Sequence, residues 1–282
     1  MTEPLSVAVV GSGRAAAARV RALDGHSGAE LVAQVSRGPA EKPATLESVL
    51  GNAAIDALVV CTPNALHAAV VGRALEAGKH VAVEYPLALT AEEGRALFAL
   101  ARERERVLHV EHIELLSPSQ RALREAAAAA GPLVSGRVHF RGTLGGWLGD
   151  EALSGPPAVR ALARLHRITD LFGESRVRAA RLDRQPDRES LEVEFAFASG
   201  GRLTLLEEWG AELARATDWE IECEDGPLEP RPADAPRGLF DEDTRCFLGR
   251  IEDGTASYVS ESRILRVLEL AASITVAAGS GN

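Results

Sequence analysis

The stretch VAVVGSGRAAAARVRAL, residues 7–23, decides how the chain begins to fold. An apolar run ends at Gly11, and a run rich in alanine and arginine, typical of a helix, follows Gly13. The pattern G-x-G-x-x-G/A is matched by Gly11, Ser12, Gly13, Arg14, Ala15 and Ala16. In this pattern the first glycine turns the chain, the second lets a pyrophosphate approach the backbone, and the third position allows close helix packing. The stretch predicts a dinucleotide site at a helix N-terminus, with a structural glycine turn as the alternative.

Outward from this motif, short apolar runs alternate with helical patterns through residue 116. The expected strands cover residues 5–10, 31–36, 57–62, 81–85 and 107–115, and the expected helices cover residues 14–23, 45–50, 65–77 and 91–104. Strands that are apolar on both faces and separated by helices indicate a parallel sheet covered on each side. We therefore predict an α/β fold in which residues 1–116 form an N-terminal Rossmann dinucleotide-binding domain.

The pattern changes after the alanine-rich segment at residues 124–133. Residues 191–210, LEVEFAFASGGRLTLLEEWG, alternate apolar and polar side chains around a turn at Gly200 and Gly201. Such alternation is typical of an antiparallel sheet with one face open. Residues 134–142 and 217–225 resemble further strands, and residues 156–173 and 260–275 resemble helices. Residues 117–282 are therefore expected to form a C-terminal α+β substrate-binding domain with a largely antiparallel sheet.

Composition restricts the class of protein. The chain has 282 residues with 31 basic and 41 acidic side chains, and its net charge of -10 argues against a nucleic-acid surface. Three scattered cysteines are too few for a disulfide framework or a metal site, which fits a reducing cytoplasm. The first residues show neither the basic start of a signal peptide nor a run long enough to span a membrane.

The end of the second expected strand predicts which dinucleotide binds. An NAD enzyme usually carries an acidic residue there for the ribose 2′-hydroxyl, whereas a 2′-phosphate needs a hydroxyl and a guanidinium. This chain offers Ser36 and Arg37. We therefore predict NADPH as the cofactor, with weaker use of NADH, unless Arg37 is only a solvated loop residue.

Residues 59–90, VVCTPNALHAAVVGRALEAGKHVAVEYPLALT, extend the pattern. With the glycine motif, they resemble the glucose-fructose oxidoreductase and inositol dehydrogenase family, which has a T-P-N-x-x-H stretch and an A-G-K-H-V-x-x-E-K-P stretch. The first is matched by Cys61, Thr62, Pro63, Asn64 and His67, which the resemblance places at the cofactor. The second is matched by Glu84 and Pro86, but Tyr85 stands where most members have lysine. His67 is expected to shape the nicotinamide pocket, and Cys61 to be a small buried residue.

Three stretches narrow the resemblance. VEYPLALT at residues 83–90, LHVEHIELL at residues 108–116 and ARLHRITDLFGE at residues 163–174 resemble the biliverdin reductase family. That resemblance implies NADPH-dependent reduction of biliverdin, a linear tetrapyrrole, to bilirubin by hydride transfer to the central methine carbon. It places Glu84, Tyr85, Glu111, His112 and Glu114 beside the nicotinamide, and Arg164 at a propionate.

Each of these roles has a structural alternative. Arg164 could instead form a helix-surface ion pair near Asp170 and Glu174. His112 and Glu114, expected on one strand face, could be structural polar groups. The substrate should need an apolar shelf, for which the open face of the antiparallel sheet is the candidate.

The sequence also lacks a base that alcohol oxidation requires. The related sugar dehydrogenases place an aspartate and a histidine on the helix that ends here at Gly173, and Val159 and Ala163 occupy those positions. Tyrosine in place of lysine is a poor base at neutral pH. A sugar or imino-acid oxidoreductase of the same fold is therefore disfavoured, and a non-catalytic dinucleotide sensor remains a further alternative.

Overall fold

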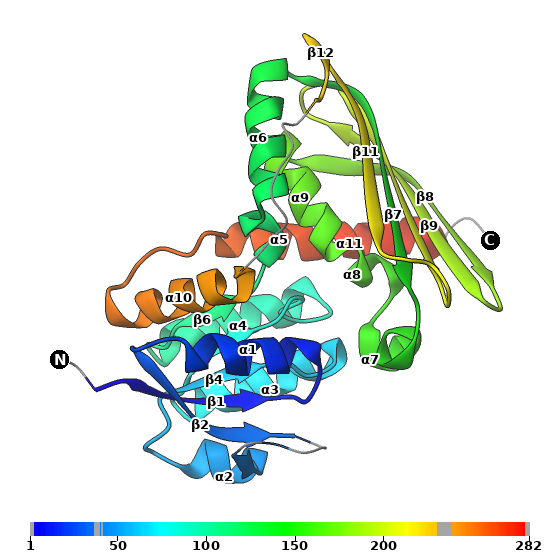
Figure 1. The fold of residues 1–282 in the computed structure, drawn as a ribbon. Coiled ribbons are helices and arrows are strands. Elements are labelled where there is room, and N and C mark those ends of the chain that lie inside the picture. Colours follow the sequence, from blue (N-terminus) through cyan, green and yellow to red (C-terminus); the bar gives the residue numbers. More distant parts are fainter. Residues whose placement is uncertain (1–2, 37–39, 41, 230–237, 280–282) are drawn as a thin grey trace. The chain divides into compact units, whose positions relative to one another are not determined.

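The structure is a computed structural model that describes residues 3–36, 40, 42–229 and 238–279. The described residues form two compact units (Figure 1). The first unit contains the described residues of 1–116 and 237–265, and the second contains those of 117–236 and 266–282.

The first unit is built on a six-stranded parallel sheet with strand order β3-β2-β1-β4-β5-β6. The strands are β1 (Leu5–Val10), β2 (Ala29–Val35), β3 (Pro43–Ala44), β4 (Ala57–Val60), β5 (His80–Val83) and β6 (Leu108–Val110). The helices are α1 (Arg14–Asp24), α2 (Leu46–Gly51), α3 (Asn64–Glu76), α4 (Ala91–Glu103), α5 (Ile113–Leu116) and α10 (Leu239–Glu252). This is the predicted Rossmann fold, in which ligands bind beyond the carboxyl ends of the strands.

Local chemistry explains where α4 begins. Thr90 precedes the helix, and its hydroxyl oxygen accepts a hydrogen bond from the backbone N–H of Glu93 at 3.2 Å. The Glu93 carboxylate accepts the backbone N–H of Thr90 at 3.1 Å, which completes a capping box. Because this start is fixed, the turn after β5 is held between a strand and a capped helix.

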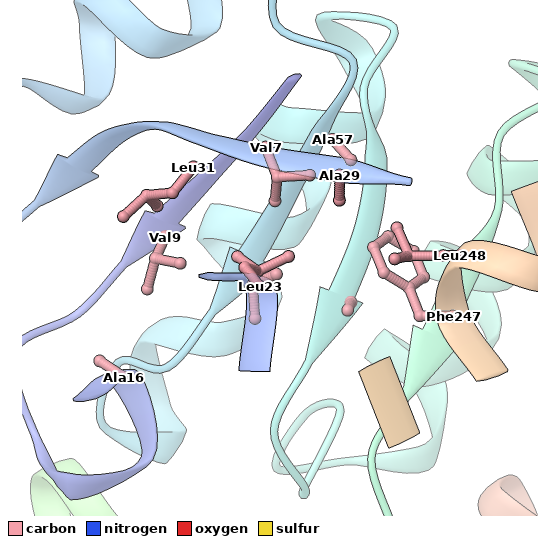
Figure 2. Close-up of a cluster of buried hydrophobic side chains, with 11 residues drawn as sticks. Val7, Val9, Ala16, Leu23, Ala29, Leu31, Ala57, Phe247 and Leu248 are labelled. Carbon is pink, nitrogen blue, oxygen red and sulfur yellow. The ribbon is translucent and has the colours of Figure 1, made fainter. Parts of the chain in front are cut away.

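The first unit takes in a segment that the sequence did not place there. Phe247 and Leu248 of α10 are buried among side chains of the parallel strands and α1, such as Val7 and Leu23 (Figure 2). The expected division put all of residues 117–282 in one domain, whereas residues 238–265 pack with the first unit. Residues 238–265 belong to the first unit because the apolar side of α10 packs against the parallel sheet. The sequence around α10 contains no motif that predicts this contact.

The last strand of the first unit is shorter than predicted. Residues 107–115 were expected to form one strand, but β6 ends at Val110 and α5 begins at Ile113. The carboxylate of Glu111 accepts the backbone N–H of Ile113 at 2.6 Å, which favours a helical turn over a continued strand. Glu84 and Tyr85 likewise follow β5, which ends at Val83, instead of belonging to it.

The second unit contains a six-stranded mixed sheet with order β12-β11-β7-β10-β9-β8. Only β7 and β10 pair in parallel, so the sheet is largely antiparallel as predicted. The strands are β7 (Leu133–Thr143), β8 (Ser175–Gln185), β9 (Arg188–Phe197), β10 (Arg202–Gly210), β11 (Ala216–Cys223) and β12 (Gly226–Pro227). The helical elements are α6 (Pro118–Ala130), η1 (Gly146–Gly149), α7 (Glu151–Ser154), α8 (Pro157–Arg160), α9 (Leu162–Phe172) and α11 (Glu261–Gly279), whose residues from 266 belong here.

The two faces of this sheet differ in chemistry. One face is apolar and buried, with contacts such as that between Phe172 of α9 and Phe197 of β9. The open face carries Arg137, His139, Arg141, Glu192, Glu194, Glu208, Asp218 and Glu220. The prediction of an apolar shelf on the open face is therefore wrong, because alternation placed the charged side chains there. In the described part of the chain, no helix is both long and apolar enough to cross a membrane.

Candidate functional site

The glycine-rich turn joins β1 to α1 and is shaped for close approach. Gly11 has a φ of 144°, and a Cβ there would lie 2.4 Å from the backbone oxygen of Cys61, so only glycine fits. A Cβ on Gly13 would meet nothing within 4 Å. α1 begins at Arg14 with neither a side-chain cap nor an acidic residue in its first turn. The geometry fits an anion such as a diphosphate at this helix end. The exposed or half-buried side chains of the turn are Ser12, Arg14 and Ala15.

The loop after β4 holds the predicted T-P-N-x-x-H residues. Pro63 precedes α3, and Asn64 is the first residue of that helix and is buried. His67 places Nδ1 2.6 Å from the carbonyl oxygen of Pro86 and Nε2 2.7 Å from that of Thr62. Burial lowers the pKa of His67, and the two carbonyl contacts oppose that fall. The ring ties this loop to the turn after β5, which fits a shaping role better than proton transfer.

The other predicted cofactor residues lie at the ends of β2 and β4. Burial raises the pKa of the Cys61 thiol well above its usual value, so the sulfur is a poor nucleophile, and its backbone closes against Gly11. Ser36 follows β2 directly and is half-buried. Arg37 lies outside the described residues.

Glu84 follows directly after β5 and is held by Arg19 of α1. Nε of Arg19 lies 2.7 Å from Oε1 of Glu84, and Nη1 of Arg19 lies 2.6 Å from Oδ2 of Asp243 in α10. The Arg19 side chain is only 2% exposed. Burial alone would lower the pKa of Arg19, but the carboxylates of Glu84 and Asp243 raise it well above its usual value. The guanidinium is therefore charged and fixed between two carboxylates.

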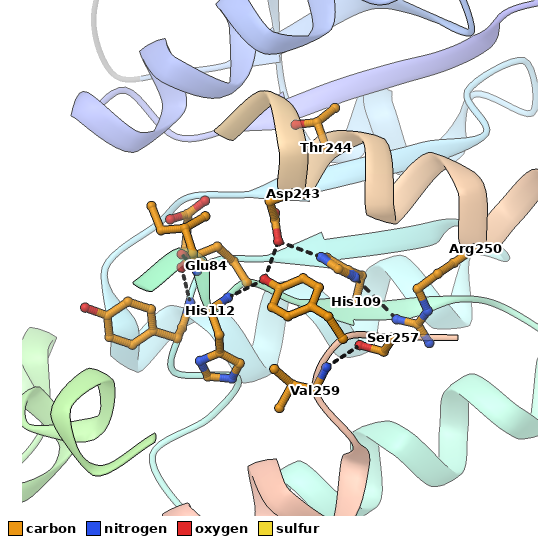
Figure 3. A network of polar contacts seen from close by, with 12 residues as sticks. Glu84, His109, His112, Asp243, Thr244, Arg250, Ser257 and Val259 are labelled. Carbon is orange, nitrogen blue, oxygen red and sulfur yellow. Dashed lines mark hydrogen bonds and ion pairs between the residues drawn. The ribbon is translucent and has the colours of Figure 1, made fainter. Parts of the chain in front are cut away.

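Asp243 connects this ion pair to the end of β6 (Figure 3). Its Oδ1 accepts a hydrogen bond from Nε2 of His109 at 2.9 Å and another from the Tyr258 hydroxyl. The Tyr258 oxygen in turn accepts the backbone N–H of His112 at 2.8 Å. Burial alone would raise the pKa of Asp243, but Arg19 and these hydrogen bonds hold it below its usual range. One carboxylate from α10 thus contacts β6 directly through His109 and is linked to the end of β5 through Arg19.

Glu111 is a second buried carboxyl beside these groups. Its Oε1 accepts the backbone N–H of Ile113 at 2.6 Å, and its Oε2 lies 3.4 Å from the backbone nitrogen of Tyr85. Burial raises the pKa of Glu111 well above its usual value, and the negative charges of Glu84 and Asp243 add to the rise. The site therefore contains two carboxyl groups with different tasks, one paired with arginine and one that favours its neutral form.

Tyr85 and His112 lie side by side in the first unit. Their ring centroids are 5.9 Å apart and their planes differ by 22°, and the Tyr85–Pro86 peptide is cis. Burial lowers the pKa of His112 to about 3, so its ring is neutral at physiological pH. Glu114 is half-buried in α5, outside any strand. The prediction that His112 and Glu114 share a strand face is therefore wrong.

Arg164 lies in α9 of the second unit and is buried. Its Nε is 2.7 Å from Oε1 of Glu207 in β10, and its Nη2 is 2.6 Å from Oε2, so the pair is bidentate. The guanidinium carbon lies 3.9 Å from the centroid of the Phe140 ring and 5.7 Å from that of Trp209. Arg164 is 4% exposed and Glu207 is 0% exposed. The arginine is thus a buried, oriented cation with aromatic faces beside it.

The surface alternative for Arg164 is wrong. Asp170 pairs with Arg124 at 2.6 Å, and Glu174 pairs with Arg266 at 2.8 Å. The expected single helix over residues 156–173 is divided into α8 and α9 at Ala161. Arg164 therefore lies in the first turn of α9 and faces the buried side of the sheet.

The positions of the missing base are apolar and closed. Val159 and Ala163 are each 3% exposed and contribute to the core of the second unit. Neither side chain can accept a proton. The described residues at these two positions therefore offer nothing that could deprotonate an alcohol, as the sequence indicated.

Sequence reasoning missed several residues of these two centres, among them Arg19, His109, Asp243, Tyr258 and Glu207. Two of them carried a signal. Helical spacing puts Arg19 on the same face as the buried Ala16 and Leu23, and strand alternation puts Glu207 between Leu205 and Trp209. A charge on an otherwise apolar face predicts a buried partner. Asp243 and Tyr258 carried no such signal, because their segment was assigned to the other domain.

Two family models match this chain, one within the first unit and one within the second unit. The model of the family described as "Oxidoreductase family, NAD-binding Rossmann fold" matches residues 5–112. The model described as "Biliverdin reductase, catalytic" matches residues 123–235.

Similarity to whole proteins covers nearly all of the chain. Biliverdin reductase A of Mus musculus is 33% identical, with 97% of each chain aligned. The human biliverdin reductase A is 28% identical over 95% of this chain and 94% of its own. The crystal structure of biliverdin reductase from Synechocystis sp. PCC 6803, in complex with biliverdin and NADP+, aligns with a TM-score of 0.86 and 28% identity over 98% and 99% of the two chains. The chain belongs to the biliverdin reductase family, within the oxidoreductases that have an NAD-binding Rossmann fold.

Proposed function

We propose that this enzyme reduces biliverdin to bilirubin with NADPH, by hydride transfer to the central methine carbon. The observation that carries the proposal is the similarity to biliverdin reductase A along 97% of the chain. The apolar residues Val159 and Ala163 and the tyrosine at position 85 support it, because reduction at a methine carbon needs no base for an alcohol. The same features argue against a sugar or imino-acid oxidoreductase.

NADPH is the proposed dinucleotide. The open backbone at Gly13 and the uncapped start of α1 suit a diphosphate. Ser36 follows β2, where the ribose is recognised in this fold, and no carboxylate stands at that position to repel a 2′-phosphate. The related Synechocystis enzyme was crystallised with NADP+. The ratio of kcat/KM with NADPH to that with NADH tests this part of the proposal, and a value near one would contradict it.

The residues after β5 and β6 are proposed to border the nicotinamide. A bound NADPH supplies the hydride. Arg19 holds the carboxyl group of Glu84 in a fixed position beside that ring. Glu111, whose pKa is raised, favours its protonated form and can hold a proton near the site, and Glu114 lies one helical turn further. Tyr85, stacked with His112, packs against and orients the bilin.

Arg164 is proposed to recognise a propionate of the bilin. A guanidinium matches a carboxylate in shape and charge, and the bidentate contact with Glu207 keeps its plane fixed. In the structure one carboxylate already occupies two of its nitrogens. Binding of a propionate would therefore add a further contact to Arg164 or compete with Glu207.

Mixing the protein with NADPH and biliverdin tests the central claim. The green absorbance of biliverdin should fall while a yellow product and oxidised dinucleotide form in equal amounts. A control without protein measures spontaneous reduction. If NADPH binds and no colour change follows, the protein is a dinucleotide sensor.

The three free cysteines support a reducing cytoplasm as the proposed location.

A further inference from the structure

The structure contains a buried charge network that neither the sequence motifs nor the proposed roles explain. Asp243 is 0% exposed and comes from α10, more than a hundred residues after the motifs of the nicotinamide region. It contacts Arg19, His109 and Tyr258 and lies outside the glycine motif and both strand ends. A buried carboxylate is costly unless its partners offset the loss of water, so its place here needs a reason.

We propose that Asp243 is a positioning residue for the dinucleotide site, which acts through Arg19 on Glu84 and through Tyr258 on the backbone of His112. The inference rests on the proposed function of these two strand ends as the nicotinamide border. It makes α10, a late segment of the chain, part of the machinery that sets the geometry of the early motifs.

The first branch runs through Arg19. Arg19 lies at 2.7 Å from Glu84 and 2.6 Å from Asp243, and Thr244 accepts a further hydrogen bond from it at 3.3 Å. The ring of Phe240 lies 4.9 Å from the guanidinium carbon. These contacts on several sides hold the guanidinium in one orientation, so Glu84 binds a partner whose position is fixed. Without Asp243, the contact of Arg19 with Glu84 would lose the support that fixes its orientation, and the carboxylate that the nicotinamide is proposed to meet could shift.

The second branch runs through Tyr258. Its hydroxyl donates to Asp243 and accepts the backbone N–H of His112 at 2.8 Å. His109 donates to the same carboxylate through Nε2, and its Nδ1 faces Nη1 of Arg250 at 3.5 Å. These contacts fix the chain at the point where β6 ends and turns into α5. The stacking of Tyr85 on His112 then depends on the same anchor.

The charge of Asp243 should affect the pKa values of the groups around it, and this effect can be tested. The titratable and charged groups that face the network include Glu84, Glu111, Cys61, His109, His112, Cys246, Arg250, Tyr258 and Arg263. The charge of Asp243 is one of the causes that raise the pKa of Glu111. Removing that charge while keeping the shape, as in Asp243→Asn, should therefore lower the pKa of Glu111. A role that only stabilises the fold would leave the pH dependence of each folded enzyme unchanged.

The experiment compares Asp243→Asn with Glu261→Gln, which makes the same type of change in the exposed ion pair with Arg102. We expect Asp243→Asn to slow single-turnover hydride transfer about tenfold while the Kd of NADPH changes less than about twofold, because the contact is with positioning groups. The rate–pH profile should move to lower pH, and the fluorescence of bound NADPH should change. Glu261→Gln should match the wild type in all four measurements.

A double-variant cycle tests whether Asp243 acts through Arg19. In an Arg19→Gln background, Asp243→Asn should add a smaller loss than it causes alone, since the Arg19 branch is already broken and only the Tyr258 branch remains. Full multiplication of the two losses would overturn the inference. If Asp243→Asn does not fold, Tyr258→Phe decides, because it removes only the bridging hydroxyl. A slower transfer with unchanged Kd would support the inference, and wild-type kinetics would overturn it.

The fluorescence measurement separates this inference from the proposed function. If the wild type binds NADPH but does not reduce biliverdin, the proposed function fails, and the emission of bound NADPH still reports on the nicotinamide surroundings. Changed emission in Asp243→Asn and Tyr258→Phe would then support positioning. Identical emission in both variants and the wild type would reject it.

Discussion

Two buried arginines, one in each unit, satisfy the same physical requirement in different ways. Arg19 is shared by two carboxylates from different elements, Glu84 after β5 and Asp243 in α10. Arg164 meets the carboxylate of Glu207 in bidentate fashion beside an aromatic ring. A buried guanidinium costs several kcal/mol unless a well-placed carboxylate offsets the loss of hydration. Both centres meet this condition.

The difference between the centres indicates different tasks. A cation between two carboxylates from distant segments fixes those segments, and it has little capacity for another anion. A guanidinium held in bidentate fashion by one carboxylate keeps a fixed plane, and that plane matches a further carboxylate in shape and charge. This difference fits the roles proposed above, with Arg19 in a positioning network and Arg164 at a propionate of the substrate.

The largest expected effect is on stability. Glu207→Gln removes the carboxylate that Arg164 meets in bidentate fashion, and we expect a loss of about 3–5 kcal/mol in the free energy of unfolding. Asp243→Asn leaves Arg19 paired with Glu84, so its loss should be about 1–3 kcal/mol. All three tryptophans lie between residues 147 and 219, so their fluorescence during urea unfolding reports on the second unit. Circular dichroism follows both units. If both variants lost the same free energy of unfolding, the second carboxylate beside Arg19 would not reduce the cost of losing the first.

The next effect separates binding from structure at Arg164. Arg164→Ala should lower kcat/KM for biliverdin by about thirtyfold to a hundredfold, since a charge-assisted contact contributes about 2–3 kcal/mol. The Kd of NADPH should stay within about twofold, because the dinucleotide motif belongs to the first unit. The measurement is made per folded enzyme, with the folded fraction taken from circular dichroism.

Arg124→Ala is the matched control for this change. It removes another arginine of the second unit, whose half-exposed side chain pairs with Asp170. Its kcat/KM should remain near that of the wild type. If Arg164→Ala loses activity only in proportion to its folded fraction, then both buried arginines are structural, and the contrast between the centres fails.

The contrast also shows what sequence could predict. The glycine motif and the alternation of strands and helices gave the Rossmann fold, because those patterns are local and periodic. Arg164 was assigned its role through the resemblance motif, and that role stays a prediction. Its partner Glu207 lies 43 positions later, and only the pairing of the strands determines which carboxylate faces the helix.

Other parts could not be predicted for physical reasons. The place of α10 depends on a long-range contact of Phe247 and Leu248 with the parallel sheet, which no local pattern records. The largely apolar residues 107–115 predict a strand. The carboxylate of Glu111 instead accepts a hydrogen bond from the backbone N–H of Ile113, and a helical turn begins there. Tertiary contacts overrode local preference in both cases.

A smaller effect should appear in the pH dependence of stability. His112 lies next to the Arg19 network, and its pKa falls to about 3 on burial, below the value of about 6.5 for an unfolded chain. Between these two pKa values the unfolded state therefore binds more protons than the folded state. The contribution of His112 to the free energy of unfolding is complete above pH 6.5 and is lost as the pH falls toward 3. Between pH 7 and pH 5 this histidine alone should cost about 2 kcal/mol.

The variant His112→Asn tests this expectation. Its free energy of unfolding should fall less between pH 7 and pH 5 than that of the wild type, whatever its absolute stability. His26→Asn, outside the network, serves as the control and should keep the wild-type slope. His67 remains in all three proteins and contributes in the same direction, since burial lowers its pKa as well. Identical slopes for the wild type and His112→Asn would mean that the His112 ring is hydrated in the folded protein.

The smallest expected effect concerns Tyr85, and it tests whether the first centre only positions groups or also supplies a proton. A phenol with a pKa near 10 is a weak acid at neutral pH, whereas an obligatory general acid contributes about a hundredfold or more. Tyr85 stacks on His112, and its backbone nitrogen faces Glu111, so the ring can orient a bilin without its hydroxyl. Tyr85→Phe should therefore lose less than about tenfold in single-turnover hydride transfer, under about 1.4 kcal/mol. Tyr85→Ala, which also removes the stacking ring, should lose more. A hundredfold loss in Tyr85→Phe with unchanged bilin affinity would make the phenol the proton donor and give the first unit a chemical role beyond positioning.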